Sequence, residues 1–272
     1  WTKLIKDKGS PHSLEGHMEI CKKASGIICS TDYLSNFYRK RYPGKPVFVC
    51  PNQMEPDDWP QRGPANVTYP DDGILRIGWF ASPSHIEDCY LIERGLEWAA
   101  KQEGVEVCVM GLEPTWWKFP FRYIPWSNDL SVYQACVGRL DIGLAPIKND
   151  VWSLCRSDLK ALDYGVCSIA PIISNNAPYS MWTHEENCLK ASTPKEFLYH
   201  IKRLVNNPRE RQELSNAAHA YVVSERTIEK NVWRWQEAIH GVKPVCGDRS
   251  SIATFSSGPG ADQFLGGLAT RS

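Results

Sequence analysis

The stretch that decides the fold spans residues 141–172 and reads "DIGLAPIKNDVWSLCRSDLKALDYGVCSIAPI". Its two ends are short apolar runs, which are typical of strands buried on both faces. Between them, residues 157–165 have leucines at helical spacing, and we expect Ser157 to be the N-cap and Gly165 the terminator of a helix. A strand, a helix and a second strand in this order predict two parallel strands joined by a crossover helix.

The same alternation continues on both sides of that stretch. Apolar runs bounded by turn residues predict further strands, and the segments between them have helical periodicity. We therefore expect an α/β fold with a doubly wound, Rossmann-like parallel sheet covered by helices on both faces. The further strands are expected at 74–80, 105–111, 121–124 and 187–191, and the further helices at 86–102, near 130–137 and in three stretches between 193 and 240.

A smaller strand–helix–strand unit precedes this region. "GIICST" at 26–31 and "PVFVCPN" at 46–52 are typical of strands, and they flank a helical stretch at 32–42. The polar residues before this unit contain no strand that begins a core. We therefore expect a partial second α/β domain, truncated relative to a longer protein.

Composition divides the chain into four parts. The stretch 53–73 is rich in Pro and acidic residues and has no apolar period, which is typical of a linker, and the Gly- and Ser-rich end is typical of disorder. The expected parts are the end of an N-terminal domain at 1–55, a linker at 56–73, a C-terminal domain at 74–241 and a disordered tail at 242–272.

Charge and cysteine content exclude several classes of protein. Of 272 residues, 31 are Lys or Arg and 31 are Asp or Glu, so the net charge of zero implies no global attraction to nucleic acid. The ten cysteines have no C-x-x-C spacing and are expected to be reduced, mostly buried thiols. The absence of D-x-D and H-x-x-x-H patterns argues against a metal site. No apolar run has membrane-spanning length, and we expect a cytoplasmic protein.

The helix at 157–165 is expected to carry a polar stripe beside its apolar one. At 100° per residue, Arg156, Lys160 and Asp163 fall together, beginning at the helix N-terminus, where free N–H groups favour an anion. Two cations and a helix start fit a diphosphate, and Asp163 would reach both hydroxyls of a ribose. The alternative is a solvated ion pair between Lys160 and Asp163 on an exposed face. The expected apolar stripe is Leu159, Leu162 and Val166.

A second loop, "GWFASPSHIED" at 78–88, leads from a strand into a helix. His85 would lie in the first helical turn, facing the same crevice as Arg156, and could donate a hydrogen bond to a phosphate or a sugar hydroxyl. Ser82 and Ser84 precede it and are further donor-side candidates. Ser84 and Glu87 also have capping-box spacing, which is a purely structural alternative for Ser84.

Residues 24–240 resemble a GT-B-fold glycosyltransferase similar to glycosyltransferase family 4. The most specific match is to a subgroup with the approximate pattern D-I-G-L-A-P-L followed by K-S-x-x-K-x-x-E-Y. In this chain residues 141–147 match the first part of the pattern. The positions specified in the second part are occupied by Arg156, Ser157, Lys160, Asp163 and Tyr164. The resemblance implies that 74–241 is the nucleotide-sugar-binding domain.

The implied reaction is transfer of a sugar, with retention of configuration, from a nucleoside diphosphate sugar to a hydroxyl of a glycan, lipid or protein. Arg156 and Lys160 would be catalytic, because negative charge builds on the β-phosphate as the glycosidic bond breaks. The resemblance implies hexosyl transfer without a metal or other cofactor.

The resemblance also assigns the donor contacts. In the family's E-x(7)-E motif the second acid binds the ribose and the first the donor sugar; Asp163 matches the second, but Cys155 stands at the first, and Asp150 is a candidate substitute. The backbone of Tyr123 and Ile124 would pair with the base edge. Ser157 is a further donor contact. Trp126 would stack on the base, or be merely packed. Asn175 and Asn176 would also contact the donor, although two asparagines equally suit a plain turn.

Two other classes remain as alternatives. A non-catalytic nucleotide-sugar-binding module, or a degenerate transferase, is favoured by Cys155 and by the shorter side chain of Asp163. A nucleotide-sugar epimerase of the same fold would need acid and base groups in the cleft, and His85 is the main candidate. A dinucleotide oxidoreductase is disfavoured because no G-x-G-x-x-G follows a strand.

Overall fold

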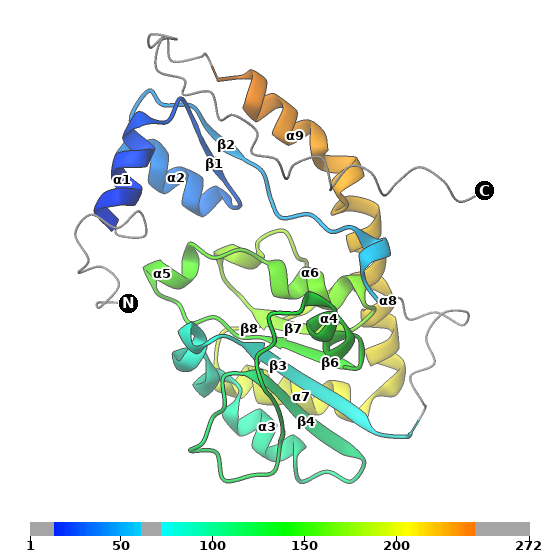
Figure 1. Ribbon diagram of the computed structural model, residues 1–272. Coiled ribbons are helices and arrows are strands. Elements are labelled where there is room, and N and C mark those ends of the chain that lie inside the picture. Colours follow the sequence, from blue (N-terminus) through cyan, green and yellow to red (C-terminus); the bar gives the residue numbers. More distant parts are fainter. Residues whose placement is uncertain (1–13, 61–71, 243–272) are drawn as a thin grey trace, which may run out of the picture. The chain divides into compact units, whose positions relative to one another are not determined.

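The computed structural model describes residues 14–60 and 72–242, and its main feature is one parallel sheet (Figure 1). Six strands form this sheet in the order β5-β4-β3-β6-β7-β8, and every neighbouring pair is parallel. The expected α/β fold with a doubly wound parallel sheet is therefore confirmed. The strands are β3 (Leu75–Ala81), β4 (Val105–Gly111), β5 (Arg122–Ile124), β6 (Ile142–Ala145), β7 (Ala170–Ser174) and β8 (Leu189–Ala191).

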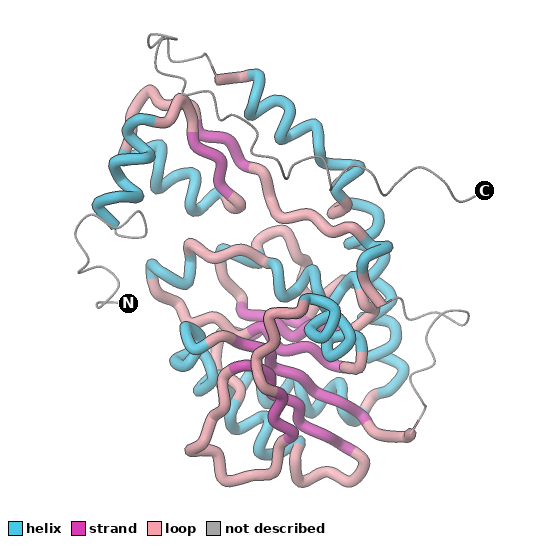
Figure 2. The backbone as a smooth tube through the Cα atoms, viewed as in Figure 1, coloured by secondary structure: helices cyan, strands magenta, loops and turns pink. Residues whose placement is uncertain are grey.

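Helices cover both faces of the sheet, as the layers in Figure 2 show. One face is covered by the 3-10 helix η3 (Pro83–Leu91), α3 (Glu93–Ala99) and α7 (Pro194–Asn206), whose Phe197 and Ile201 pack with Trp79 of β3. The other face is covered by α4 (Leu130–Gly138), α6 (Leu159–Val166) and α8 (Pro208–Glu225). Burial from both sides explains why the central strands are uninterrupted apolar runs: every residue of β6 and β7 is buried.

The chain reverses its direction across the sheet between β3 and β6. From β3 the strands proceed outward to β4 and β5, whereas from β6 they proceed the other way to β7 and β8. At such a switch point the loops that leave the two central strands separate, and a crevice opens at the carboxyl ends of the strands. The fold therefore places the loop after β3 and the loop after β6 on either side of one crevice.

A second, two-stranded parallel sheet pairs β1 (Ile27–Cys29) with β2 (Val47–Val49). The crossover helix α2 (Asp32–Arg41) joins them, as the smaller strand–helix–strand unit predicted. Helix α1 (Leu14–Lys23) was not expected, and its Cys21 packs with Tyr38 of α2 in a small separate core.

The segment after β2 is built into the larger part of the chain. Met54 is 3% exposed and forms a parallel bridge with Thr227, which lies between α8 and α9 (Ile228–His240). A short 3-10 helix, η2 (Pro56–Asp58), follows. Of the predicted linker, residues 61–71 lie outside the described residues, as do 1–13 and the predicted disordered tail from 243 onward. The domain boundaries at 55, 73 and 241 stay predictions.

Three predictions about individual helices were wrong. The helix expected at 157–165 begins at Leu159, after Asp158, and ends at Val166; Ser157 accepts a hydrogen bond from Asn52 instead of capping it. Leu159 is 47% exposed, so it does not belong to the apolar stripe, whereas Leu162 and Val166 are fully buried. The helix expected at 86–102 is divided into η3 and α3. A separate short helix, α5 (Val151–Leu154), precedes α6.

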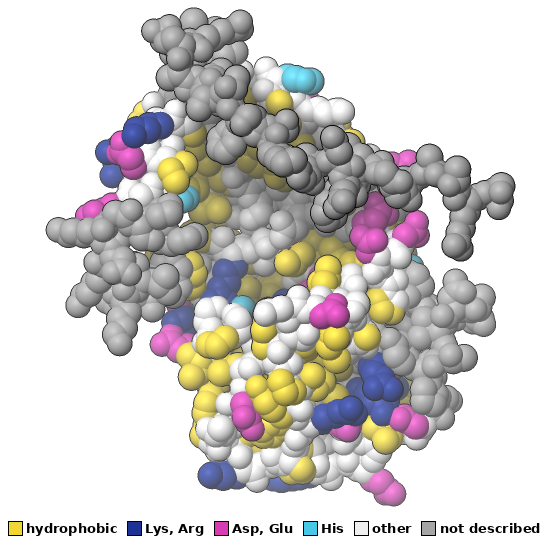
Figure 3. Space-filling view, viewed as in Figure 1, with side chains coloured by type: hydrophobic (Ala, Val, Ile, Leu, Met, Phe, Trp, Pro, Cys, Tyr) yellow, Lys and Arg dark blue, Asp and Glu magenta, His cyan; other side chains and the backbone are white. Residues whose placement is uncertain are grey.

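The surface carries charge of both signs (Figure 3), and the described cysteines form no disulfides. On the face shown in Figure 3, basic and acidic side chains lie in small separate groups. All nine cysteines that the structure describes are free, and only Cys136 and Cys155 are not buried. None of the described helices is both long and apolar enough to cross a membrane.

Candidate functional site

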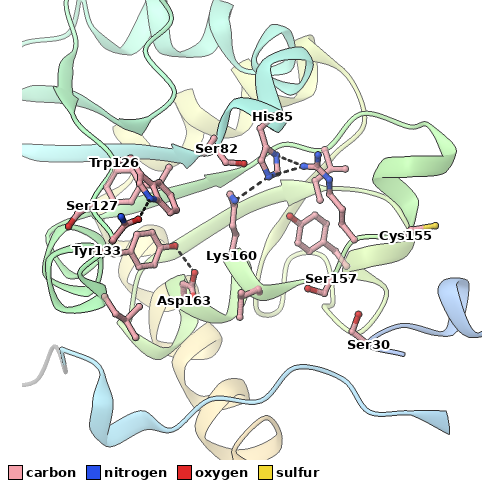
Figure 4. Close-up of a pocket in the computed structure, with 18 residues that line it drawn as sticks. Ser30, Ser82, His85, Trp126, Ser127, Tyr133, Cys155, Ser157, Lys160 and Asp163 are labelled. Atoms are coloured by element: carbon pink, nitrogen blue, oxygen red, sulfur yellow. Dashed lines mark hydrogen bonds between the residues drawn. The ribbon is translucent and has the colours of Figure 1, made fainter. Parts of the chain in front are cut away.

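A cavity of about 690 Å³ lies at the carboxyl ends of the strands, where the loops after β3 and β6 face α4 and α6. The close-up in Figure 4 shows side chains from these four elements around one space. The switch point of the sheet thus coincides with the cavity. The residues predicted from the sequence that line it are Ser82, His85, Trp126, Arg156, Ser157, Lys160 and Asp163.

Arg156 reaches from the short turn before α6 across to the loop after β3. Its Nη2 donates to the carbonyl oxygen of Ser84 at 3.0 Å, and its Nη1 lies 2.6 Å from Nδ1 and 2.8 Å from Nε2 of His85. The nearest carboxylate oxygen belongs to Asp88, at 3.4 Å. The guanidinium is therefore oriented by neutral acceptors and only weakly paired, which leaves donors for an anion in the cavity.

His85 lies between an acid and two cations. Its Nδ1 is 2.7 Å from Oδ2 of Asp88 and 2.6 Å from Nη1 of Arg156, and its Nε2 is 2.8 Å from the same Nη1 and 3.4 Å from Nζ of Lys160. Burial lowers the pKa of His85, and the two nearby cations lower it further against the opposing effect of Asp88. The neutral imidazole therefore lies between Arg156 and Lys160 and contacts both of them.

Asp163 lies on α6, one turn after Lys160, and is buried. It is 4% exposed, and Tyr133 of α4 donates to its Oδ2 at 2.6 Å. Burial raises the pKa of Asp163 to about 7, although Tyr133 and Lys160 both lower it. Burial likewise lowers the pKa of Lys160. The alternative of a solvated Lys160–Asp163 pair on an exposed face is therefore wrong.

The first turn of α6 has no side-chain cap. Asp158 occupies the N-cap position, but its carboxylate makes no hydrogen bond to the helix amides that follow. The Ala161 and Leu162 amides donate to the Asp158 carbonyl, so the helix-start donors beside Arg156 and Lys160 are the amides of Leu159 and Lys160, together with the positive end of the helix dipole. This combination of a helix start and two cations is suited to a phosphate group.

Trp126 is 58% exposed at the edge of the cavity, so it is not a core side chain, and its stacking on a base stays a prediction. Its Nε1 donates to Oδ1 of Asn128 at 3.1 Å, which fixes the plane of the ring. Gly111, at the end of β4, has a φ of +89°, and a Cβ there would lie 3.1 Å from the indole and 2.6 Å from the carbonyl oxygen of Ala81. Only glycine allows the end of β4 to lie this close to both the Ala81 carbonyl and the Trp126 ring.

The other predicted donor contacts do not line the cavity. Ser84 contributes its carbonyl to Arg156, and its hydroxyl lies 2.8 Å from that of Ser82; the capping box with Glu87 is wrong, because Glu87 forms an ion pair with Lys148 instead. The remaining side chains have other roles. The Tyr123 hydroxyl donates to the Gly111 carbonyl, Ile124 packs in the core, Asn175 is exposed, and Asn176 donates to the carbonyl of Ile147.

The position of the family's first acid is occupied by a thiol. Cys155 ends α5 and lines the cavity, and burial raises the pKa of its thiol. Asp150 does not replace the missing carboxylate there. It caps α5 by accepting from the Ser153 amide at 2.8 Å and pairs with Lys148 at 2.7 Å.

The sequence reasoning missed Asp88 and Tyr133. Asp88 is 2% exposed and joins the two crevice loops, because it binds His85 and also accepts from the Lys148 amide at 2.8 Å. The spacing of His85 and Asp88, three residues apart in a helical turn, was a signal that was not used. Tyr133 gave no local signal, since it meets Asp163 only through the packing of α4 on α6. Among the described residues, no cluster of three or more His, Cys, Asp or Glu side chains is placed to hold a metal ion.

Sequence comparison finds no relatives, whereas structural comparison finds many. No protein-family model matches the chain, and no curated protein matches it. Among solved structures, Anabaena Alr3699/HepE in complex with UDP and glucose has a TM-score of 0.68 at 9% identity, with 85% of this chain and 68% of that chain covered. Sucrose-phosphate synthase from Thermosynechococcus elongatus has a TM-score of 0.62 at 11% identity, with 84% and 61% covered.

A third structure matches the larger part of the chain alone. The C-terminal domain of a group 1 glycosyl transferase family protein, LpcC from Francisella tularensis, is 13% identical with a TM-score of 0.51, and the match covers 64% of this chain and 99% of that domain. The chain thus spans about two thirds or less of the two longer neighbours. At these identities the likeness establishes the GT-B fold, and membership of family 4 stays a prediction.

Proposed function

We propose that this chain carries the donor site of a retaining glycosyltransferase, which moves a hexosyl group from a nucleoside diphosphate sugar to an acceptor hydroxyl. The observation that carries the proposal is the convergence of Arg156, Lys160 and the uncapped start of α6 on one cavity at the switch point. The neighbours of the same fold support it, since HepE was solved with UDP and with UDP-glucose. UDP is therefore the first nucleotide to test.

In this proposal the diphosphate lies between Arg156, Lys160 and the first turn of α6. Both cations are held by the neutral His85 ring, so they are oriented before the donor arrives. As the glycosidic bond breaks, charge develops on the β-phosphate, and fixed donors in a partly dry site stabilise that charge more than water does. These groups supply the positive charge without a metal ion.

The nucleoside lies toward α4 and β5. Asp163 accepts hydrogen bonds from the ribose hydroxyls, and Tyr133 holds its carboxylate in place at 2.6 Å. The exposed face of Trp126 stacks on the base, because an aromatic ring at the rim of a cavity offers area with little loss of conformational freedom. The acceptor is a hydroxyl of a glycan, a lipid or a protein.

Calorimetric titration with UDP, GDP and ADP tests the phosphate site. We expect the parent chain to bind one of them and Arg156→Ala to lower that affinity about 10- to 100-fold, because each hydrogen bond between charged groups is worth about 1.5–3 kcal/mol. Arg94→Ala, at an exposed position of α3, is the matched control. No binding by the parent, or equal binding by Arg156→Ala, would remove the proposal.

The second candidate is a module that binds a nucleotide sugar without transferring it. Cys155 favours this candidate, because a thiol whose pKa is raised by burial does not replace a carboxylate at the donor sugar. An assay of UDP release from UDP-glucose, with and without acceptor sugars, distinguishes the two on a protein that contains this chain. Binding without any release of UDP supports the module, and acceptor-dependent release supports the transferase.

A further inference from the structure

Asp158 is the N-cap residue of α6, yet its side chain faces away from the helix. An aspartate at this position normally accepts from the amide two or three residues later. Here Oδ2 accepts from Nη1 of Arg226 at 2.7 Å and from Nε1 of Trp182 at 3.1 Å, and Oδ1 accepts from Nη2 of Arg226 at 3.2 Å. Two parallel bonds from one guanidinium therefore hold the carboxylate off the helix amides.

Arg226 is fixed by contacts to residues that do not themselves line the donor cavity. It is 2% exposed, in the turn after α8, and it donates to the Tyr221 hydroxyl at 3.1 Å and to the Asn52 carbonyl at 3.0 Å. Its own carbonyl accepts from the Met54 amide at 2.8 Å. Burial lowers the pKa of Arg226, but Asp158 and Tyr221 together outweigh it, so the pKa stands above the usual value. Neither Arg226 nor Asp158 lines the cavity.

The alternative position of this carboxylate would interfere with an anion. Asp158 has φ −87° and ψ 18°, and its own carbonyl accepts from the Ala161 amide at 2.9 Å. If its backbone turned to the extended N-cap conformation, the carboxylate would occupy the Lys160 amide and place a negative charge at the start of the helix, where the dipole favours an anionic ligand. A phosphate there would lose a helix donor and meet a like charge. The direction of one side chain thus determines whether the first turn of α6 is open.

We propose that Arg226 is a positioning residue, which holds the carboxylate of Asp158 off the first turn of α6 and keeps that turn open to a phosphate group. The inference rests on the proposed function for the identity of the ligand. It adds a requirement outside the cavity: the turn between α8 and α9 determines the anion affinity of a helix start that Arg226 contacts through Asp158.

The test uses titration of UDP into three variants. Arg226→Met is expected to weaken UDP binding about tenfold, because the unpaired carboxylate turns to the helix amides and competes with the phosphate. Adding Asp158→Asn to that variant removes the competing charge and is expected to restore the affinity to within about threefold of the parent. Arg203→Met, which removes another ion-paired arginine on α7, is the matched control and is expected to bind like the parent.

A merely structural role makes the opposite prediction. If Arg226 only stabilises the fold, the double variant binds no better than Arg226→Met, and that result overturns the proposal. If Arg226→Met does not fold, Arg226→Lys retains the charge but loses the two-pronged contact, and the same partial rescue by Asp158→Asn is expected. Absence of that rescue overturns the proposal equally.

A crystal structure of Arg226→Met without nucleotide separates this inference from the proposed function. We expect the Asp158 carboxylate to accept from the amide of Lys160. A carboxylate that remains on Trp182 contradicts the inference, whatever binds in the cavity. If the carboxylate turns as expected but the parent binds none of the nucleoside diphosphates, the proposed function fails and the positioning role of Arg226 stands.

Discussion

Two arginines, Arg156 and Arg226, lie at the start of α6, each near a buried aspartate, yet their environments differ. Arg226 makes two bonds to Asp158 at 2.7 and 3.2 Å and is 2% exposed. Arg156 lies 3.4 Å from Asp88, its side chain is 16% exposed, and its closer contacts are the neutral His85 and a backbone carbonyl. Both terminal nitrogens of the Arg226 guanidinium are bound within the protein, whereas the Arg156 guanidinium keeps donors for a ligand.

The comparison explains why charge of both signs gathers around one short helix. Asp158 and Arg226 neutralise each other on the inner side, so they contribute order without net charge. Arg156 and Lys160 leave positive charge on the cavity side, where Asp88 already belongs to His85 and to the Lys148 amide. A buried charge that is paired is structural, and one that is only partly paired is available for binding.

The largest expected effect separates the two arginines by stability. Arg226→Met leaves Asp158 buried without its partner and should lower the free energy of unfolding by about 3–5 kcal/mol. Arg156→Met should lower it by about 1 kcal/mol or less, because Asp88 keeps its other hydrogen bonds. Urea denaturation of both variants measures the difference. Equal losses would mean that the two arginines do not differ as described.

The two aspartates of α6 should respond oppositely to replacement by Asn. The pKa of Asp163 in the folded protein is about 7 against an ordinary 3.8, so the folded state binds its proton more tightly than the unfolded state. Ionisation of Asp163 therefore lowers the free energy of unfolding as the pH rises from about 4 to about 7. At pH 8, Asp163→Asn should raise the free energy of unfolding by about 2–4 kcal/mol, and the gain should vanish near pH 4.

Asp158→Asn should destabilise at pH 8, since it breaks the pair with Arg226. Urea denaturation of both variants at pH 8 and near pH 4 therefore compares the two sides of α6 directly. Destabilisation by Asp163→Asn at pH 8, or a pH dependence equal to that of the parent, would show that Asp163 is not held in a site that disfavours its charge.

The smallest effect concerns Tyr133. Tyr133→Phe removes the hydrogen bond that favours the ionised form of Asp163, so the pKa of Asp163 should rise further and stability should fall by about 1 kcal/mol. Carboxyl NMR titration gives the pKa. Tyr123→Phe, which loses only a bond to the Gly111 carbonyl, is the control and should leave Asp163 unchanged. An unchanged pKa in Tyr133→Phe would remove the role of the tyrosine.

The central sheet was predictable because its signal is local. β6 is a continuous apolar run, and β3, β4 and β7 are apolar apart from one residue each, a pattern that indicates burial on both faces. The smaller unit gave the same kind of signal in β1, α2 and β2. Helix α1 was missed although Leu14, Met18 and Cys21 have helical spacing, because its sequence is otherwise mostly polar.

The candidate site was predictable only in part. Arg156, Lys160 and Asp163 fell on one stripe by helical spacing, and all of them line the cavity. Capping positions failed because distant partners determined them: Asp158, not Ser157, precedes α6, and its carboxylate binds a residue 68 positions later. Glu87 likewise pairs with Lys148 instead of capping its own helix. Contacts between elements, such as Tyr133 on Asp163, leave no trace in local spacing.

A crystal structure of the chain with bound UDP tests the central claim most directly. The account predicts that the phosphates lie within hydrogen-bond distance of Arg156, Lys160 and the first amides of α6, at the carboxyl ends of β3 and β6. Phosphates that bind elsewhere, for example in the groove beside Arg122 and Gly104, would contradict it.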